Sequence, residues 1–406
     1  MPRTFAFSPE EEAFRREVRT LLRDEIAPEL PSLREAAEKH AFPRALVDRL
    51  ARRGLLGLAV PREWGGAGRG EAAHCIALEE LGRLDASLAT IVGAHAGIGT
   101  VPILLHGTDE QRARWLPDLA SGRRIAAFAL TEPAAGSDAA SLRTRARREG
   151  DAWVLSGSKL YVTNGDVADT LVVFAATREE AGPKGITAFV VERPNRGVRV
   201  GAVEDKLGIR ASTTAELVFE DCRVPAGNVL GEVDRGFAVA LTALDGGRVA
   251  LAAGVLGGAL SLLERCAQRL RGRALDGESV EDRQADLFRL ADMAADTHVG
   301  LLATYQAAAL VEEYYGMLRG RREPPAELRR SVSRQAAIVK VFASEAASRA
   351  AERALAIEGL SGLADGRPVE RALRDAPIGE IFEGTNDIQR LIVARSVLSD
   401  LGVGSA

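Results

Sequence analysis

Cysteine is scarce in this sequence, and its copies stand far apart. Cys75, Cys222 and Cys266 form no C-x-x-C pair. A disulfide framework and a cysteine-ligated zinc site are therefore not expected, and a reducing compartment is favoured. The histidines, at positions 40, 74, 95, 106 and 298, lack the spacing of metal ligands, so we predict no metal site. We expect His95, which lies in an apolar segment, to be a core residue.

Neither sign of charge is in excess. The 53 basic and 57 acidic residues leave a net charge of −4, whereas nucleic acids and anionic membranes bind concentrated positive charge. Both kinds of partner are excluded on this ground. We expect charged residues to interrupt every apolar run, and the first residues show no basic segment followed by an apolar one. We predict a cytoplasmic protein without membrane insertion.

The residue pattern divides the chain into regions that predict helices and a region that predicts strands. A chain of 406 residues is longer than one hydrophobic core usually serves, so we expect two or three domains. Ser8 can cap a first helix, Pro9 suits its first position, and Glu11 has the capping-box spacing. Further helical patterns up to about residue 120 cover 72–84, 87–105 and 109–119.

The residue pattern changes near residue 125, where short runs of β-branched and aromatic residues alternate with turn-forming residues. These expected strands are 153–155, 159–163, 170–175, 186–191, 198–203 and 215–219. Helical periods return over 241–270, 283–318, 330–357 and 388–398. We predict a mainly α protein with a central β domain, divided into a helical region 1–124, a β region 125–234 and a helical region 235–406.

Glycine-rich stretches do not indicate a nucleotide-binding Rossmann fold. The stretch 65–70 follows no expected strand and does not match G-x-G-x-x-G, so we interpret it as a loop. Gly254, Gly257 and Gly258 lie inside a helical pattern, where small residues let helices pack closely.

Three segments carry residues suited to chemistry. In 130–138 a β-run ends in small and hydroxyl residues, which can offer backbone N–H groups to an anionic or polar cofactor edge. In 159–165 a strand presents Tyr161 and Thr163 at alternating positions. Each segment alone is also consistent with an ordinary turn or hairpin strand.

The third segment, 381–390, places an acid in an apolar setting. Glu383 follows Ile381 and Phe382 and precedes Gly384 and a helix. An acid there can simply complement the positive helix N-terminus, but that interpretation does not explain the apolar neighbours or the glycine.

Together these segments resemble the acyl-CoA dehydrogenase family over about residues 9–398. The similarity includes the stretches 60–66, 208–212, 219–225, 245–248 and 368–371. It implies a helical N-domain, a central antiparallel β-barrel and a C-terminal four-helix bundle, with FAD between the β domain and the bundle. It also implies FAD-dependent dehydrogenation of the Cα–Cβ bond of an acyl thioester in fatty acid metabolism, converting acyl-CoA to trans-2-enoyl-CoA.

The resemblance implies roles for individual residues. Flavin contacts are expected at Phe128, Leu130, Thr131, Gly136, Ser137, Tyr161, Thr163, Thr385 and Asp387. Substrate contacts are expected at Ser137, Asp245, Arg248 and Gly384. At the position of Tyr161 the family more often has tryptophan.

Glu383 is the expected catalytic base, because an α-C–H beside a thioester is weakly acidic and needs a carboxylate to remove it. By resemblance, the β-hydrogen leaves as hydride to flavin N5, and the thioester oxygen is held by the Glu383 N–H and a ribityl hydroxyl. Bound substrate should raise the pKa of Glu383 by desolvation, against the helix N-terminus. Some family members place their base where this chain has Gly247, so Glu383 has no rival.

The sequence departs from the family at two motifs that contact FAD on a neighbouring subunit. In the first motif Arg273, Gly277 and Gln284 are kept, but Asp276 replaces an aromatic residue. In the second, Gly359 is kept, while Ala356 and Leu360 replace glutamine and glycine. Two hypotheses follow: weaker FAD binding, through lost stacking and like-charge repulsion, or pairing with an unlike subunit.

The expected partners follow from these alternatives. We expect a homo-oligomer, a tetramer or dimer, that passes electrons to an electron-transfer flavoprotein. An acyl-carrier-protein thioester in a biosynthetic pathway is an alternative substrate. A non-catalytic subunit of a hetero-oligomer and a flavin oxidase or monooxygenase are alternative functions. The residues give no acyl chain length.

Overall fold

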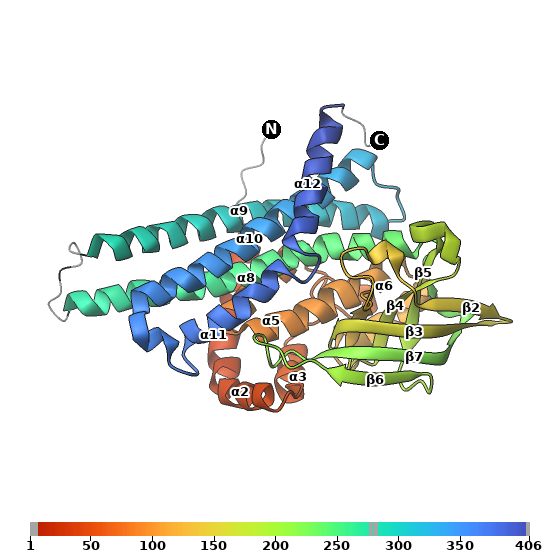
Figure 1. The fold of residues 1–406 in the computed structure, drawn as a ribbon, viewed down its shortest axis with the longest axis horizontal. Helices are drawn as coiled ribbons and strands as arrows, with labels where there is room; N and C mark the ends of the chain where they lie inside the picture. The colour runs from red at the N-terminus through yellow and green to blue at the C-terminus, as the bar shows by residue number, and fades with distance from the viewer. Residues whose placement is uncertain (1–6, 276–278, 280–282, 403–406) are drawn as a thin grey trace.

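A computed structural model describes residues 7–275, 279 and 283–402, and its N-terminal part is helical (Figure 1). The α-helices of this part are α1 (Pro9–Leu21), α2 (Leu30–Glu38), α3 (Arg44–Arg52), α4 (Gly70–Leu84), α5 (Ala86–Gly93), α6 (Val101–His106) and α7 (Asp109–Ala120). The π-helical turn η4 (Ala94–Gly99) joins α5 to α6, so the single helix expected over 87–105 is divided.

The first helix begins as its sequence predicts. The Ser8 hydroxyl accepts a hydrogen bond from the Glu11 N–H at 3.2 Å, and the Ser8 N–H donates to the Glu11 carboxylate at 2.7 Å. Both bonds satisfy N–H groups that a helix start leaves without partners. Phe14 and Val18 then lie on the buried face.

The central part is one sheet. Its strands are β1 (Ala126–Ala129), β2 (Arg145–Glu149), β3 (Ala152–Thr163), β4 (Thr170–Ala176), β5 (Ile186–Glu192), β6 (Val198–Val203), β7 (Thr214–Pro225) and β8 (Val229–Leu230). Their order is β6-β7-β3-β2-β4-β5-β8, with β1 also paired to β4.

The expected antiparallel barrel is corrected by this sheet. Among the described residues β6 and β8 do not pair, so the sheet is open. The pairing is mixed, because β1 runs parallel to β4 and β2 meets β4 in parallel at one register position. Short β-branched runs predict strands but carry no information on which non-adjacent strands pair, and β1 joins the sheet beside β4 rather than beside its neighbour in sequence.

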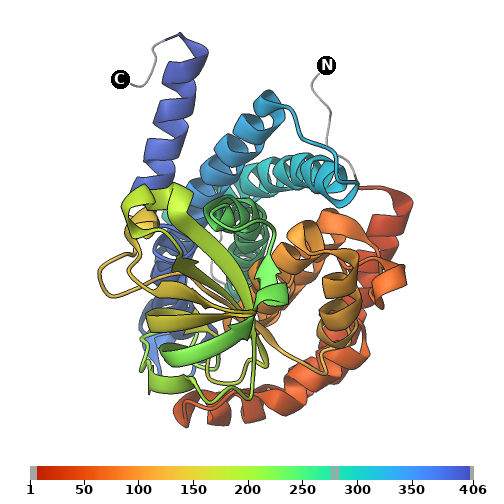
Figure 2. The ribbon, with the colours of Figure 1, turned by 90° about the vertical axis from the view of Figure 1, so that its right-hand side faces the viewer.

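Three long helices form the C-terminal core: α8 (Gly236–Leu275), α9 (Gln284–Arg319) and α10 (Ala326–Glu358). They pack on one another, and α4 lies against α8 and α9. The short α11 (Pro368–Asp375) and the last helix α12 (Asn386–Asp400) pack on α10. The sheet lies at one end of the long helices, and α12 projects from the body (Figures 1 and 2). The mainly α class with a central β domain is confirmed.

Close helix packing explains the glycines inside α8. A Cβ on Gly257 would lie 2.0 Å from the backbone oxygen of Glu79, and one on Gly82 would lie 1.9 Å from that of Gly254. Both distances are far inside van der Waals contact, so α4 and α8 approach closely only because these positions lack a side chain.

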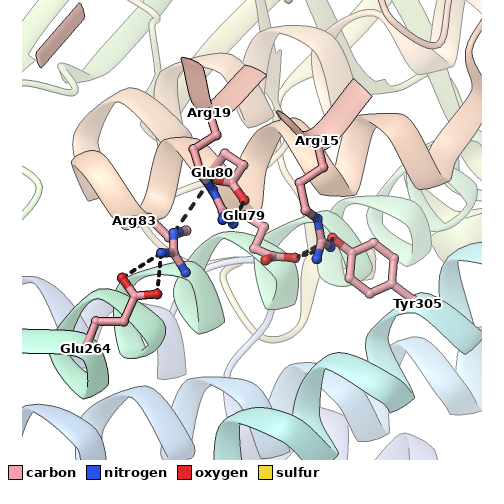
Figure 3. A network of polar contacts seen from close by, with 7 residues as sticks. All are labelled: Arg15, Arg19, Glu79, Glu80, Arg83, Glu264 and Tyr305. Carbon is pink, nitrogen blue, oxygen red and sulfur yellow. Dashed lines mark hydrogen bonds and ion pairs between the residues drawn. The ribbon is translucent and has the colours of Figure 1, made fainter. Parts of the chain in front are cut away.

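Polar contacts join α1 and α4 to the long helices (Figure 3). Arg15 reaches the buried Glu79 at 3.0 Å, and Glu79 also accepts from the Tyr305 hydroxyl of α9. The second branch of the network consists of Arg19, Glu80, Arg83 and Glu264. Burial raises the pKa of Glu79, and Arg15 opposes that shift. The network fixes α4, which forms part of the cavity described below.

The expectation about apolar runs was wrong in one respect. Ala86–His106 and Gly236–Gly272 are long and apolar enough to cross a membrane, and Ala86–His106 contains no charged residue. However, 78% and 72% of their most apolar windows are buried inside the fold. They are core helices, and His95, in the first of them, bonds the Leu119 oxygen and the Ala126 N–H.

Candidate active site

A cavity of about 810 Å³ opens where the three parts of the chain meet. Its wall includes Thr90 and Ala94 from the N-terminal helices, Tyr161 from β3, and Leu244 from α8. The turn between α11 and α12 closes it, and Glu383 lies in that turn. The wall is mostly apolar, as in sites that bury a ligand.

Most of the expected site residues meet at this cavity. The ones that line it are Phe128, Leu130, Thr131, Gly136, Ser137, Tyr161, Thr163, Arg248, Glu383, Gly384 and Thr385. They come from β1, the loop after it, β3, α8 and the turn before α12, so segments far apart in sequence form one site.

Four other expected residues do not line the cavity. Asp245 lies behind it, where it binds Arg248. The Asp387 side chain is 91% exposed and pairs with Arg390 at 3.3 Å, so the structure does not bring it to the cavity. Gln284 and Gly359 are exposed elsewhere, in keeping with an expected role toward a neighbouring subunit. The side chain of Arg273 and residues Asp276 and Gly277 lie outside the described residues.

Glu383 occupies a left-handed backbone conformation with φ 57°, which is uncommon for a residue other than glycine. Its Oε2 atom is buried and accepts no hydrogen bond within the described part of the chain. Desolvation raises the pKa of Glu383 to about 7, while the charges of Arg248 and Lys340 oppose the shift. A buried carboxyl that titrates near neutrality, with an unused oxygen, is suited to accept a proton.

Arg248 holds the turn around Glu383. Its Nε donates to the Glu383 backbone oxygen at 3.0 Å, and its Nη1 donates to Asp245 at 2.7 Å. Gln389 of α12 donates to the Gly384 backbone oxygen at 3.2 Å. Burial raises the pKa of Asp245 to about 6, against the nearby Arg248 charge. The turn is thus fixed by its backbone, and the Glu383 side chain is left to face the cavity.

A missing side chain in α8 makes room for the Glu383 carboxylate. A Cβ on Gly247 would lie 2.8 and 3.0 Å from the two carboxylate oxygens, and 2.7 Å from the Cγ2 of Ile98. The carboxylate therefore lies directly over the α-carbon of Gly247.

A buried ion pair supports the loop 130–138. Lys159 of β3 is fully buried, and its Nζ donates to Glu132 at 2.6 Å and to the Leu130 oxygen at 3.1 Å. Glu132 also accepts from the backbone N–H groups of Arg143 and Thr144 at 2.6 and 2.9 Å. The sequence pattern alone does not predict this pair, although a lysine within a strand rich in apolar residues is a signal of a buried charge.

Tyr161, Ile209 and Glu383 are three residues other than glycine with positive φ that line the same cavity. Left-handed conformations cost free energy and gather at functional sites, where the surroundings enforce them. Tyr161 is 63% exposed, and its ring makes no aromatic contact with the residues that the structure describes, so it presents a free aromatic face to the cavity.

Models of one family match each part of the chain. The acyl-CoA dehydrogenase N-terminal domain matches residues 8–123, the middle domain 127–222 and the C-terminal domain 234–398. The chain belongs to the acyl-CoA dehydrogenase family.

Named relatives are similar over nearly their whole length. The chain is 39% identical to an acyl-CoA dehydrogenase of Bacillus subtilis, covering 96% of this chain and 98% of that protein. It is 41% identical to the mitochondrial short-chain specific acyl-CoA dehydrogenase of Bos taurus, covering 94% and 89%.

Solved structures share the fold. The structure of butyryl-CoA dehydrogenase from Megasphaera elsdenii has a TM-score of 0.89 and 34% identity, covering 97% of this chain and 99% of that chain. A chain from a structure titled for the electron transferring flavoprotein of Acidaminococcus fermentans has a TM-score of 0.89 and 36% identity, with the same coverage. The acyl-CoA dehydrogenase of Bacillus anthracis complexed with FAD has a TM-score of 0.87 and 33% identity, covering 98% and 67%.

Proposed function

We propose that this protein is an FAD-dependent dehydrogenase of short-chain acyl-CoA thioesters, with Glu383 as the base. The observation that carries the proposal is the buried Glu383 Oε2, which has no hydrogen-bond partner in the described chain and faces the cavity. The relatives named for short-chain and butyryl-CoA substrates support the substrate class.

The chain's own residues supply the proton transfer. Glu383 accepts the α-proton of the thioester, and its raised pKa makes it a stronger base than a solvated carboxylate. The Glu383 backbone N–H donates no hydrogen bond within the described residues, so it can bind the thioester oxygen as negative charge develops there. FAD, when bound, supplies the hydride acceptor for the β-hydrogen.

The lining residues fit such a cofactor. Tyr161 offers an exposed aromatic face for stacking, and Thr131 and Thr163 bring hydroxyl groups to the cavity wall. The backbone N–H groups of Gly136 and Ser137 bond no acceptor in the described chain, so they can donate to a polar or anionic cofactor edge. Glu383 and Arg248 complete the wall on the α8 and α12 side.

We further propose a homo-oligomer that passes electrons to an electron-transfer flavoprotein in the cytoplasm. Four exposed apolar residues recur at helical spacing on α12 and its C-terminal cap: Leu391, Ala394, Leu398 and the cap residue Leu401. Such a face on a projecting helix supports association with a second copy. Leu360, 88% exposed where the family has glycine, adds apolar surface beside Gly359.

The test is anaerobic addition of acyl-CoA esters to the purified yellow protein. The acyl chains run from about four to about sixteen carbons, because the length that fits depends on the depth of the cavity. Bleaching of the flavin by butyryl-CoA, with weaker bleaching as the chain lengthens, is the expected result. A Glu383→Gln variant should bind flavin but resist bleaching. If no CoA ester bleaches the wild-type protein while a carrier-protein thioester does, the substrate class is wrong; bleaching of the Glu383→Gln variant at the wild-type rate would remove Glu383 as the base.

A further inference from the structure

Lys340 is a fully buried lysine of α10 that none of the mechanism above uses. Its Nζ donates a hydrogen bond to the side-chain oxygen of Asn386 at 2.8 Å. No carboxylate oxygen of the described residues lies within 4.0 Å of this Nζ. A buried ammonium without a paired carboxylate is costly, so its presence calls for a compensating charge at longer range.

The compensating charge is that of Glu383. The charged groups that face Lys340 are Glu383 and Glu380, which stabilise its ammonium form, and Arg248 and Arg390, which oppose it. Glu383 acts most strongly among the four. Burial lowers the pKa of Lys340 to about 8, so the ammonium form still prevails at pH 7.

The other cation near Glu383 already has its own carboxylate. Arg248 pairs with Asp245 at 2.7 Å, whereas Glu380 accepts from Ser348 and Arg390 pairs with Glu345 and Asp387. Arg248 nevertheless lowers the pKa of Glu383 more than Lys340 does. Lys340 adds a second buried positive charge, which has no carboxylate of the described residues within 4.0 Å.

Lys340 also fixes the start of α12. Asn386 is the first residue of that helix and is buried, and its amide nitrogen donates to Ser344 of α10 at 3.0 Å. Thr385, directly before it, is the helix cap. Lys340 and Ser344 thus hold Asn386 on α10, three residues after Glu383, and this contact anchors the turn that presents the carboxylate.

We propose that Lys340 is a positioning residue for the oxidation: it anchors Asn386 at the start of α12, and with it the turn that presents Glu383, and its buried ammonium adds to Arg248 in favouring the ionised form of the carboxylate. This inference rests on the proposed role of Glu383. When an apolar acyl chain fills the cavity, the carboxylate loses its remaining solvent, and desolvation favours the neutral carboxyl, which cannot accept a proton. A neighbouring ammonium that is itself buried keeps its full effect because water does not screen it.

The test compares Lys340→Met, which removes the charge and the hydrogen bond at similar length, with Ser344→Ala, which removes the hydrogen bond between Ser344 and Asn386 and keeps the Lys340 ammonium with its partner. Flavin reduction by butyryl-CoA is followed anaerobically between about pH 6 and 9.5. This range covers the pKa of a carboxyl group that burial has raised. In Lys340→Met the acidic limb of the rate profile should move up by about one pH unit, with the rate restored at high pH. In Ser344→Ala the rate should fall at every pH without moving the limb.

A second measurement requires neither substrate nor turnover. The stability gain of Glu383→Gln over the parent is measured against pH in the wild-type and Lys340→Met backgrounds. The pH at which this gain stops growing marks the pKa of Glu383 in the folded chain, and it should be higher without Lys340. An unchanged value in a folded Lys340→Met variant, or a limb that does not move, would overturn the inference. If butyryl-CoA fails to bleach the wild type, the proposed function fails, and the stability measurement still decides the role of Lys340.

Discussion

The guanidinium of Arg248 binds the backbone oxygen of Glu383, at 3.0 Å, and not its carboxylate. A direct ion pair would hold the pKa of Glu383 low and occupy the oxygen that must receive a proton. Because Arg248 binds the main chain and pairs with Asp245 instead, the turn is rigid while the carboxylate stays free. Burial then raises the pKa of Glu383 to about 7.

Gly247→Ala should displace the catalytic carboxylate. The added methyl group would lie 2.8 Å from a Glu383 oxygen and 2.7 Å from Ile98 Cγ2, so one of these groups must move. A misplacement of about 1 Å costs on the order of 100-fold in rate. We expect flavin reduction by butyryl-CoA to slow by about that factor, as measured by stopped flow.

Gly272→Ala is the matched control, because it lies in the same helix, does not line the cavity, and its Cβ would meet no heavy atom of the described residues within 4 Å. Both substitutions gain similar helix propensity. Equal reduction rates in the two variants would contradict the proposed position of the carboxylate.

Glu383→Gln should be more stable than the wild type above pH 7. The pKa of Glu383 in the folded chain, about 7, lies above its ordinary value of 4.5 because of burial. Between these pH values the folded chain keeps a proton that the unfolded chain has released, so wild-type stability falls as the pH rises. The 2.5-unit difference (7 minus 4.5) corresponds to on the order of 3 kcal/mol.

Urea unfolding at several pH values measures this difference. The advantage of Glu383→Gln should be small near pH 5, should grow toward pH 7, and should be constant above it. Glu313→Gln, at an exposed position of α9, is the control and should show no such growth. A stability gain independent of pH would mean that Glu383 is not a proton-holding group in the folded chain.

Much of the fold could be predicted from local patterns. The Ser8–Glu11 cap and the buried positions Phe14 and Val18 follow from spacing alone, because helix starts and apolar faces are encoded within a few residues. The open sheet could not be predicted, because the pairing of β1 with β4 depends on contacts between distant residues.

Site residues could be predicted from sequence where their role follows from the neighbouring residues in the chain. They could not be predicted where the role depends on contacts with other helices or strands. Glu383 can be identified from the residues next to it in the sequence. The proposed role of Lys340 can be inferred only from the structure, in which α10 places it beside Asn386. The contact of Asp387 with the cofactor stays a prediction: the first turn of α12 directs its side chain toward Arg390 and away from the cavity. Residues one position apart on a helix face different directions, and sequence alone does not give the rotation of α12.

Lys159→Met should destabilise the protein and loosen the loop before β2. It leaves the Glu132 carboxylate buried without its cation, and removing one partner of a buried pair costs about 3–5 kcal/mol. The double variant Glu132→Gln/Lys159→Met should recover part of that loss, because no unpaired charge remains. Urea unfolding gives the coupling; two independent, additive losses would contradict a buried ion pair at this position.

Charged substitutions on α12 should break the oligomer. Leu391 and Leu398 are 48% and 47% exposed and lie two helical turns apart on one face. A second copy covering this face would bury them, and a glutamate there would be buried without a partner, at a cost of several kcal/mol per site. We expect light scattering to give an oligomer for the wild type and a monomer for Leu391→Glu/Leu398→Glu, with little change in monomer stability.

Ser396→Glu/Ser399→Glu adds the same charge to other faces of α12 and should keep the oligomer. An oligomer of wild-type mass in the leucine variant would show that this face is not the contact, and a monomeric wild type would exclude the homo-oligomer itself.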